Sequence, residues 1–265
     1  CTDTDYMVNC LNDLGIATIQ EKDQITIHGC NGKLPKPKNN NLYTHNAGTT
    51  TRFITALSTL ANTAITINGD KRMNQRPIRP LTDALNQIGA AITSTGDCPP
   101  LQISAKPPTG GQLTIPGNIS SQYISAILLI APFLKETTTI IITDKLCSKP
   151  YLDITLKLLD QFGLKYHNHD YKIITIPGQQ QSKIIREYTV ESDASSASYP
   201  AAYAALHPNT PVRLKNINKS SIQGDIAFID YLEKMGCKIE TINKDTIITG
   251  PKKLKTLGTI DMNET

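Results

Sequence analysis

Tryptophan is absent from this chain of 265 residues, and phenylalanine and tyrosine are so few that aromatic residues make up only 5% of it. The chain also has no large excess of charge of one sign: its formal net charge is +4, and lysine and arginine are scattered along it. Nucleic-acid-binding proteins usually combine a basic patch with aromatic side chains. The composition therefore argues against a nucleic-acid partner and fits a cleft for a small anion.

Long hydrophobic runs are missing too. The longest nearly apolar run, residues 124–134, is interrupted by Ser125 and Pro132, and it is far shorter than the roughly 20 residues of a membrane span. The N-terminal residues are acidic and polar, unlike a signal peptide. We therefore expect a cytoplasmic protein without a membrane segment. Because the first residue is Cys1 rather than Met, we also expect a piece of a longer chain.

Metal-binding patterns are the third absence. The six cysteines form no Cys-x-x-Cys pair, and the five histidines show no metal-ligand spacing. Six cysteines in a chain of this length are ordinary for a reduced protein. We therefore expect free thiols and no metal site. With 39% hydrophobic and 19% charged residues, the chain has the composition of a globular protein rather than a disordered or coiled-coil one.

A repeat organises what is present. The pattern Leu-x-x-apolar-Gly-apolar occurs four times, and its leucines, spaced 74, 74 and 73 residues apart, are Leu11, Leu85, Leu159 and Leu232. Each copy ends a helical pattern, with glycine where a left-handed C-cap is needed. Two β-branched strand patterns follow each copy. These strand pairs are expected within residues 17–27, 91–103, 164–176 and 237–248.

A second helix, rich in small and apolar residues, is expected in each unit at residues 51–61, 122–134 and 197–206. A strand should follow each one, at residues 64–68, 138–143 and 211–216. One unit then comprises strand, buried helix, strand, amphipathic helix and two strands over about 74 residues. Such alternation favours helices inside and sheets outside. A solenoid is the alternative, although this repeat is longer than the common solenoid periods.

Polar clusters stand at the start of each expected buried helix, at residues 46–52, 120–123 and 193–199. A helix N-terminus offers free N–H groups and the positive end of a dipole, so each cluster could bind an anion. Plain N-capping is the alternative, because Ser, Thr, Asn and Asp are the usual caps. Arg72 and Arg76 lie in a loop before the next helix, which could likewise be an anion contact or a solvated basic loop.

Six segments, in the same order and at similar spacing, resemble motifs of the 5-enolpyruvylshikimate-3-phosphate synthase family. They are Asn46-Ala-Gly-Thr49 with Arg52, Arg72-Met-Asn-Gln-Arg-Pro-Ile78, Ser120-Ser-Gln-Tyr123, Ser148-Lys-Pro-Tyr-Leu-Asp-Ile154, Asp193-Ala-Ser-Ser-Ala-Ser-Tyr199 and Gln223-Gly-Asp225. The related UDP-N-acetylglucosamine enolpyruvyl transferases share the fold but lack the Ser-Ser-Gln and Asp-Ala-Ser-Ser-Ala-Ser-Tyr segments.

The resemblance implies the enolpyruvyl transferase fold, an α/β fold (α+β in some schemes) of repeated βαβαββ units in two domains. Residues 1–190 are expected to form most of the substrate-binding domain, and residues 191–265 part of the second domain. The chain begins and ends within a unit, so we expect it to be truncated at both ends.

The family transfers the enolpyruvyl group of phosphoenolpyruvate to the 5-hydroxyl of shikimate 3-phosphate and releases phosphate. This reaction belongs to the shikimate pathway, which leads to chorismate and the aromatic amino acids, and it uses no metal or organic cofactor. The resemblance further implies a monomer. The residues implied for phosphoenolpyruvate are Gly48, Arg76 and Gln122, with Asn46, Thr49 and Arg52 shaping the pocket. Those implied for shikimate 3-phosphate are Ser120, Ser121, Gln122, Ser148 and Tyr151.

The catalytic groups of the family are expected outside this chain. The family motif Asp-Met-Asn-x-x-Pro-Asp ends in the catalytic Asp, and this sequence stops at Asp261-Met-Asn-Glu-Thr265. The catalytic Glu should also lie beyond Thr265, so we expect no turnover by these residues alone. Three alternatives stay open: an inactive anion-binding fragment, a module of a multifunctional shikimate-pathway polypeptide, or an RNA 3′-phosphate cyclase, which would need a nucleotide site.

Overall fold

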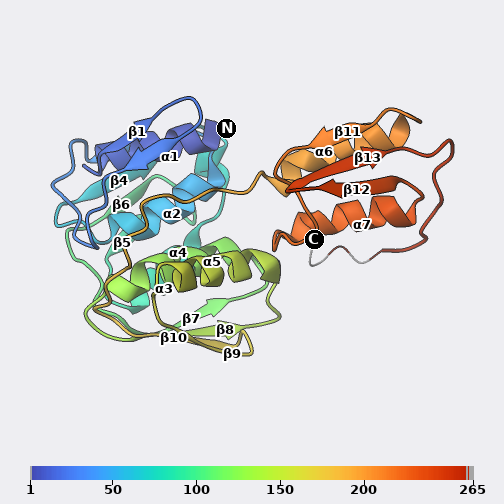
Figure 1. Cartoon of the computed structure of the whole chain (residues 1–265). Coiled ribbons are helices and arrows are strands. Elements are labelled where there is room, and N and C mark those ends of the chain that lie inside the picture. The colour runs from blue at the N-terminus through green and yellow to red at the C-terminus, as the bar shows by residue number, and fades with distance from the viewer. Residues whose placement is uncertain (1, 261, 263–265) are drawn as a thin grey trace. The chain divides into compact units, whose positions relative to one another are not determined.

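A computed structural model describes residues 2–260 and 262. Asp261 and residues 263–265 lie outside the described residues. They belong to the start of the motif in which the catalytic Asp of the family is expected. The chain divides into two compact units: unit 1 holds residues 1–146 and 157–184, and unit 2 holds residues 147–156 and 185–265 (Figure 1). The domain boundary predicted at residue 190 stays a prediction. Among the described residues, no helix has the length and apolar character needed to cross a membrane.

Unit 1 contains two four-stranded sheets with the same topology. In each, the first strand runs parallel to the second, and the other neighbours are antiparallel. One sheet has the order β3 (Asn41–Tyr43), β4 (Ile65–Asn68), β6 (Leu101–Ile103), β5 (Ile92–Ser94). The other has the order β7 (Gly111–Pro116), β8 (Thr138–Thr143), β10 (Ile173–Ile176), β9 (His167–His169). A two-stranded sheet of β1 (Thr18–Gln20) and β2 (Ile25–Ile27) completes the strands of this unit.

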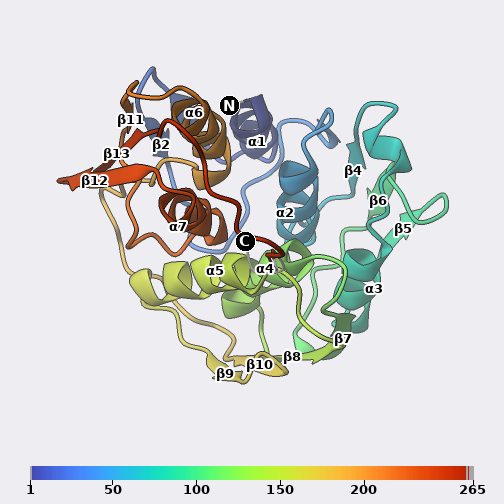
Figure 2. The same ribbon diagram turned by 90° about the vertical axis from the view of Figure 1, so that its right-hand side faces the viewer.

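Helices α2 (Gly48–Ser58) and α4 (Ser121–Ile130) lie inside the sheets of unit 1, as Figure 2 shows. These two helices contact each other, and α1 (Thr2–Asp13) and α3 (Arg79–Gln87) contact α2 and α4 in turn. Eight of the ten residues of α4 are buried. The division between the units falls within α5 (Lys149–Gln161). The expected arrangement of inner helices and outer sheets is therefore confirmed.

Helix α2 is buried although it is rich in threonine. The hydroxyls of Thr51 and Thr55 donate hydrogen bonds to the carbonyls of Ala47 and Thr51, at 2.8 and 2.7 Å. Such bonds to the preceding turn satisfy the hydroxyl inside the helix itself. A polar sequence can therefore occupy the interior without leaving these donors unpaired.

Several helix limits differ from those expected, and α2 also ends early, at Ser58 rather than at residue 61. Helix α2 begins at Gly48 and α6 (Ala194–Leu206) at Ala194, each three residues early, because both polar clusters form the first helical turn. Helix α4 ends at Ile130, and a 3-10 turn, η2 (Ala131–Phe133), follows it. Pro132 has no N–H and its ring clashes with the preceding turn, so a regular α-helix is not continued there.

Unit 2 contains a three-stranded antiparallel sheet in the order β11 (Val212–Leu214), β13 (Asp245–Thr249), β12 (Lys238–Ile242). Helix α6, the 3-10 turn η3 (Gly224–Ile226) and α7 (Ala227–Lys234) belong to the same unit. Ala201, Leu214, Ile229 and Ile248 are among the residues of its core.

The parallel first strand expected before α6 is not found among the described residues of unit 2. Its place in the chain is taken by an irregular segment, residues 177–193. Ile184 and Val190 in this segment are 92% and 75% exposed, so they have no buried face that would hold a strand on the sheet.

The asparagine that follows the repeat leucine in the first two copies, Asn12 and Asn86, has a structural role in unit 1. The side chain of Asn86 accepts a hydrogen bond from the N–H of Ile92 at 2.8 Å and donates one to its carbonyl at 3.0 Å. Asn12 makes the same pair of bonds with Thr18, at 3.0 and 2.9 Å. This asparagine clamp connects the end of an amphipathic helix to the start of the next strand.

We expect Asn86→Ala to lower the free energy of unfolding by about 1–3 kcal/mol, because two partly buried side-chain hydrogen bonds are lost. Urea denaturation of the variant and the parent protein measures this difference. Asn62→Ala, at an exposed position between α2 and β4, is the matched control and should change the midpoint little. An Asn86 variant as stable as the control would show that the clamp does not stabilise the fold.

Candidate functional site

The N-terminus of α2 differs from those of α4 and α6, the helices at corresponding places in the repeat. Helix α6 is less buried than the other two, because only four of its thirteen residues are buried. Ser120 caps α4, its hydroxyl accepting from the N–H of Gln122 at 3.3 Å, and Asp193 caps α6 by accepting from the N–H of Ser195 at 3.0 Å. At α2 the cap position is Ala47, which has no side chain that could accept. The N–H groups of the first turn of α2 thus carry no side-chain cap, and they provide a positive pole where an anion could bind.

Arg76 lies directly against this first turn. A Cβ atom built on Gly48 would stand 2.8 Å from both Nη atoms of the arginine. The guanidinium therefore occupies the space that any larger residue at position 48 would fill. Arg76 follows the 3-10 turn η1 (Met73–Gln75), and the buried Met73 side chain anchors this loop in the core.

Arg52 and Gln122 bring α2 and α4 together in the same region. Arg52 Nη1 donates a hydrogen bond to Gln122 Oε1, and Gln122 Nε2 lies 3.4 Å from Thr49 Oγ1 and donates to it. Since the arginine uses the amide oxygen, it orients the amide NH2 group toward Thr49. The guanidinium also lies over the ring of Tyr123, with Cζ 5.2 Å from the ring centroid.

A pocket of unit 1 lies between α2 and the loop that carries Arg76, and it is lined by Gly48, Thr51, Arg52, Met73, Arg76, Pro77, Ile78 and Pro99. The described lining includes two arginines and no acidic residue. Guanidinium groups form paired hydrogen bonds with phosphate and carboxylate. The arrangement therefore suits a small anion with more than one acidic group. We refer to it as the arginine pocket.

The structure brings together five of the residues expected for phosphoenolpyruvate, which are Gly48, Thr49, Arg52, Arg76 and Gln122. The sixth, Asn46, is exposed in the turn just before α2. Ser120 and Ser121 begin α4, where Ser121 is buried and Ser120 is half-buried.

Ser148 and Tyr151 belong to unit 2 and lie at the start of α5. The Tyr151 hydroxyl donates a 2.6 Å hydrogen bond to Asp225 Oδ2, to which the Ser195 hydroxyl also donates at 2.9 Å. Burial, and then the bond to Asp225, raise the pKa of Tyr151. Sequence reasoning assigned no role to Asp225 and missed this contact, although the residue lies in the Gln223-Gly-Asp225 motif.

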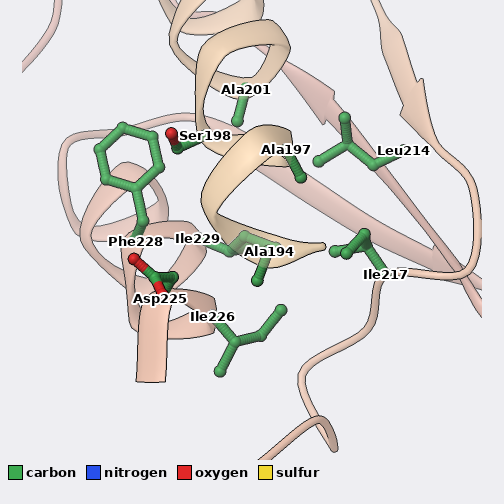
Figure 3. Close-up of a pocket in the computed structure, with 10 residues that line it drawn as sticks. All are labelled: Ala194, Ala197, Ser198, Ala201, Leu214, Ile217, Asp225, Ile226, Phe228 and Ile229. Carbon is green, nitrogen blue, oxygen red and sulfur yellow. The ribbon is translucent and has the colours of Figure 1, made fainter. Parts of the chain in front are cut away.

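Unit 2 has a pocket of its own, between α6 and the η3–α7 segment (Figure 3). Its lining is mainly apolar, with Ser198 and Asp225 as the polar residues. It offers no cation to an anionic ligand, in contrast to the arginine pocket.

The described part of the chain gives little support for catalysis by a cysteine or for a metal site. Its five cysteines are free, and burial, reinforced by Asp13, raises the pKa of Cys10 to about 12. A thiol that stays protonated is a poor nucleophile. Among residues 2–260 and 262, no group of three His, Cys, Asp or Glu side chains is placed to hold a metal ion.

Comparison with known proteins identifies the family. The family model described as EPSP synthase (3-phosphoshikimate 1-carboxyvinyltransferase) matches residues 1–265. The chain belongs to this family. Among curated 3-phosphoshikimate 1-carboxyvinyltransferases, that of Buchnera aphidicola subsp. Baizongia pistaciae is 41% identical over 266 residues, which cover 99% of this chain and 61% of the relative. That of Colwellia psychrerythraea is 42% identical over 265 residues, covering 98% and 62%.

Solved structures of EPSP synthases show the same fold. An EPSP synthase from Acinetobacter baumannii superposes with a TM-score of 0.76 and 25% identity, covering 95% of this chain and 57% of that one. The family and the fold class predicted from the motifs are thereby confirmed. The chain spans about three fifths of the length of the EPSP synthases that it matches.

Proposed function

We propose that the protein containing this chain transfers the enolpyruvyl group of phosphoenolpyruvate to the 5-hydroxyl of shikimate 3-phosphate and releases phosphate. The observation that carries the proposal is the arginine pocket at the uncapped N-terminus of α2, in a chain of the EPSP synthase family. Phosphoenolpyruvate has a phosphate and a carboxylate, and two guanidinium groups together with free N–H groups complement both.

In this proposal Gly48, Arg76 and Gln122 bind phosphoenolpyruvate. The absence of a side chain at Gly48 lets Arg76 reach the helix terminus. Asn46, Thr49 and Arg52 shape the pocket, and the bonds of Gln122 to Arg52 and Thr49 support this role because they orient its amide. Preorganised donors of this kind stabilise anions at little cost in reorganisation.

Ser120, Ser121 and Gln122 are proposed to bind shikimate 3-phosphate, and so are Ser148 and Tyr151. The family resemblance supports these assignments. Gln122 would then contact both substrates and help to hold the 5-hydroxyl near C2 of phosphoenolpyruvate, which lowers the entropic part of the barrier. A base must take the hydroxyl proton and an acid must protonate C3; none of the residues named here is assigned to either step.

Further parts of the proposal concern the state of the protein. A monomer located in the cytoplasm, without a nucleic-acid partner, is proposed from the family resemblance and from the mild net charge of +4. Size-exclusion chromatography of the full-length protein measures the oligomeric state directly.

The activity is tested by measuring phosphate release by the full-length protein. Release should require both phosphoenolpyruvate and shikimate 3-phosphate, and the organic product should contain the enolpyruvyl group on the 5-oxygen. UDP-N-acetylglucosamine in place of shikimate 3-phosphate is the control acceptor and should give no product. Turnover with the control acceptor alone, or no turnover with either acceptor, would contradict the proposed function.

A further inference from the structure

Tyr123 is a buried residue to which the proposed function assigns no role. It lies on α4 next to Gln122 and is 2% exposed. A buried tyrosine hydroxyl needs a hydrogen-bond partner, and this one donates to the carbonyl of Pro77 at 2.8 Å. Pro77 directly follows Arg76, so the hydroxyl of Tyr123 holds the loop that carries this arginine.

The ring of the same tyrosine holds the other arginine. The guanidinium of Arg52, on α2, lies over the ring of Tyr123, with Cζ 5.2 Å from its centroid. The negative face of an aromatic ring attracts a cation at this distance. Arg52 also donates to Gln122, the neighbour of Tyr123, so two adjacent residues of α4 fix its position.

One side chain thus contacts both segments that supply the arginines of the pocket. Tyrosine has only two side-chain torsions, and the ring of Tyr123 is enclosed by the core. The side chain is therefore rigid, and its contacts with Arg52 and with the carbonyl of Pro77 stay in a fixed arrangement. We propose that Tyr123 is a positioning residue that sets the separation of Arg52 and Arg76, and through it the affinity for phosphoenolpyruvate. This inference rests on the proposed function.

The expected effect is selective for one substrate. The phosphate and the carboxylate of phosphoenolpyruvate are held at a fixed separation, so two paired guanidinium contacts require a matching separation of the arginines. Shikimate 3-phosphate is assigned to residues at the start of α4 and in unit 2, which Tyr123 does not hold through its hydroxyl. A loss of the hydroxyl should therefore affect phosphoenolpyruvate first.

Tyr123→Phe in the full-length protein removes only the hydroxyl, and we expect the KM for phosphoenolpyruvate to rise about fivefold. The KM for shikimate 3-phosphate and kcat should stay within about twofold of the parent values, since binding of one substrate is changed. Tyr123→Leu also removes the ring under Arg52, and the rise should reach about 30-fold. If the leucine variant does not fold, the phenylalanine variant decides the question.

Tyr166→Phe is the matched control, because it removes a hydroxyl that donates to Asp160 at 2.9 Å outside the arginine pocket. It should leave both KM values unchanged. An unchanged KM for phosphoenolpyruvate in Tyr123→Phe, or an equal rise in both KM values, would overturn the positioning role while leaving the proposed function standing. A parent protein with neither turnover nor a thermal shift with phosphoenolpyruvate would overturn both.

Discussion

Arg76→Ala in the full-length protein is expected to raise the KM for phosphoenolpyruvate about 100-fold, because a pair of charge-assisted hydrogen bonds is lost. The KM for shikimate 3-phosphate should change by less than about threefold, since this arginine is assigned to phosphoenolpyruvate alone. Steady-state kinetics with each substrate varied in turn measures both values.

The control for this variant is Arg72→Ala. Arg72 lies in the same loop but is exposed, and it does not line the arginine pocket. The change should leave both KM values close to those of the parent. Equal effects of Arg76→Ala on the two substrates, or equal effects of the two arginine variants, would count against the assignment of Arg76.

Gly48→Ala is expected to raise the KM for phosphoenolpyruvate about tenfold or more while the protein stays folded. Its added Cβ would stand 2.8 Å from both Nη atoms of Arg76, so the guanidinium must leave the helix terminus. Stability should not fall, because alanine is a better helix former than glycine. Kinetics and thermal unfolding of the same preparation separate the two effects.

A double variant tests how Gly48→Ala acts. If the methyl group acts by displacing Arg76, then Gly48→Ala combined with Arg76→Ala should be no worse than Arg76→Ala alone. Gly29→Ala serves as a control glycine, since a Cβ there meets no atom within 4 Å. Multiplying effects in the double variant would show that the methyl group blocks the ligand itself rather than the arginine.

Much of the fold could be predicted because the repeat combines two local signals. A helix-ending glycine and a following pair of β-branched segments indicate the same unit four times, and all four strand pairs are present. The missing strand before α6 could not be predicted from the period alone. Whether residues 184–190 pair with a sheet depends on a buried face for Ile184 and Val190, which the structure does not provide.

The site was predictable in its residue types but not in its contacts. Motif resemblance indicated Arg52 and Gln122, yet they are 70 residues apart in the sequence, and only the packing of α2 on α4 brings them together. The role of Tyr123 depends on the same packing. Which of the helices has a side-chain cap also needed coordinates, because every cluster contains residues that are able to cap.

The start of α2, which has no side-chain cap, distinguishes this helix from the two helices at corresponding places in the repeat. Helices α2, α4 and α6 occupy corresponding places in the repeat, and α4 and α6 each begin with a side chain that caps the first turn. At α2 an alanine stands at that position, so the cap residue has no side chain that accepts from the backbone donors of the first turn. In the proposed function, the anion site at α2 therefore depends on the lack of a capping hydroxyl or carboxylate at one of three corresponding positions, and Arg52 and Arg76 add the positive charge.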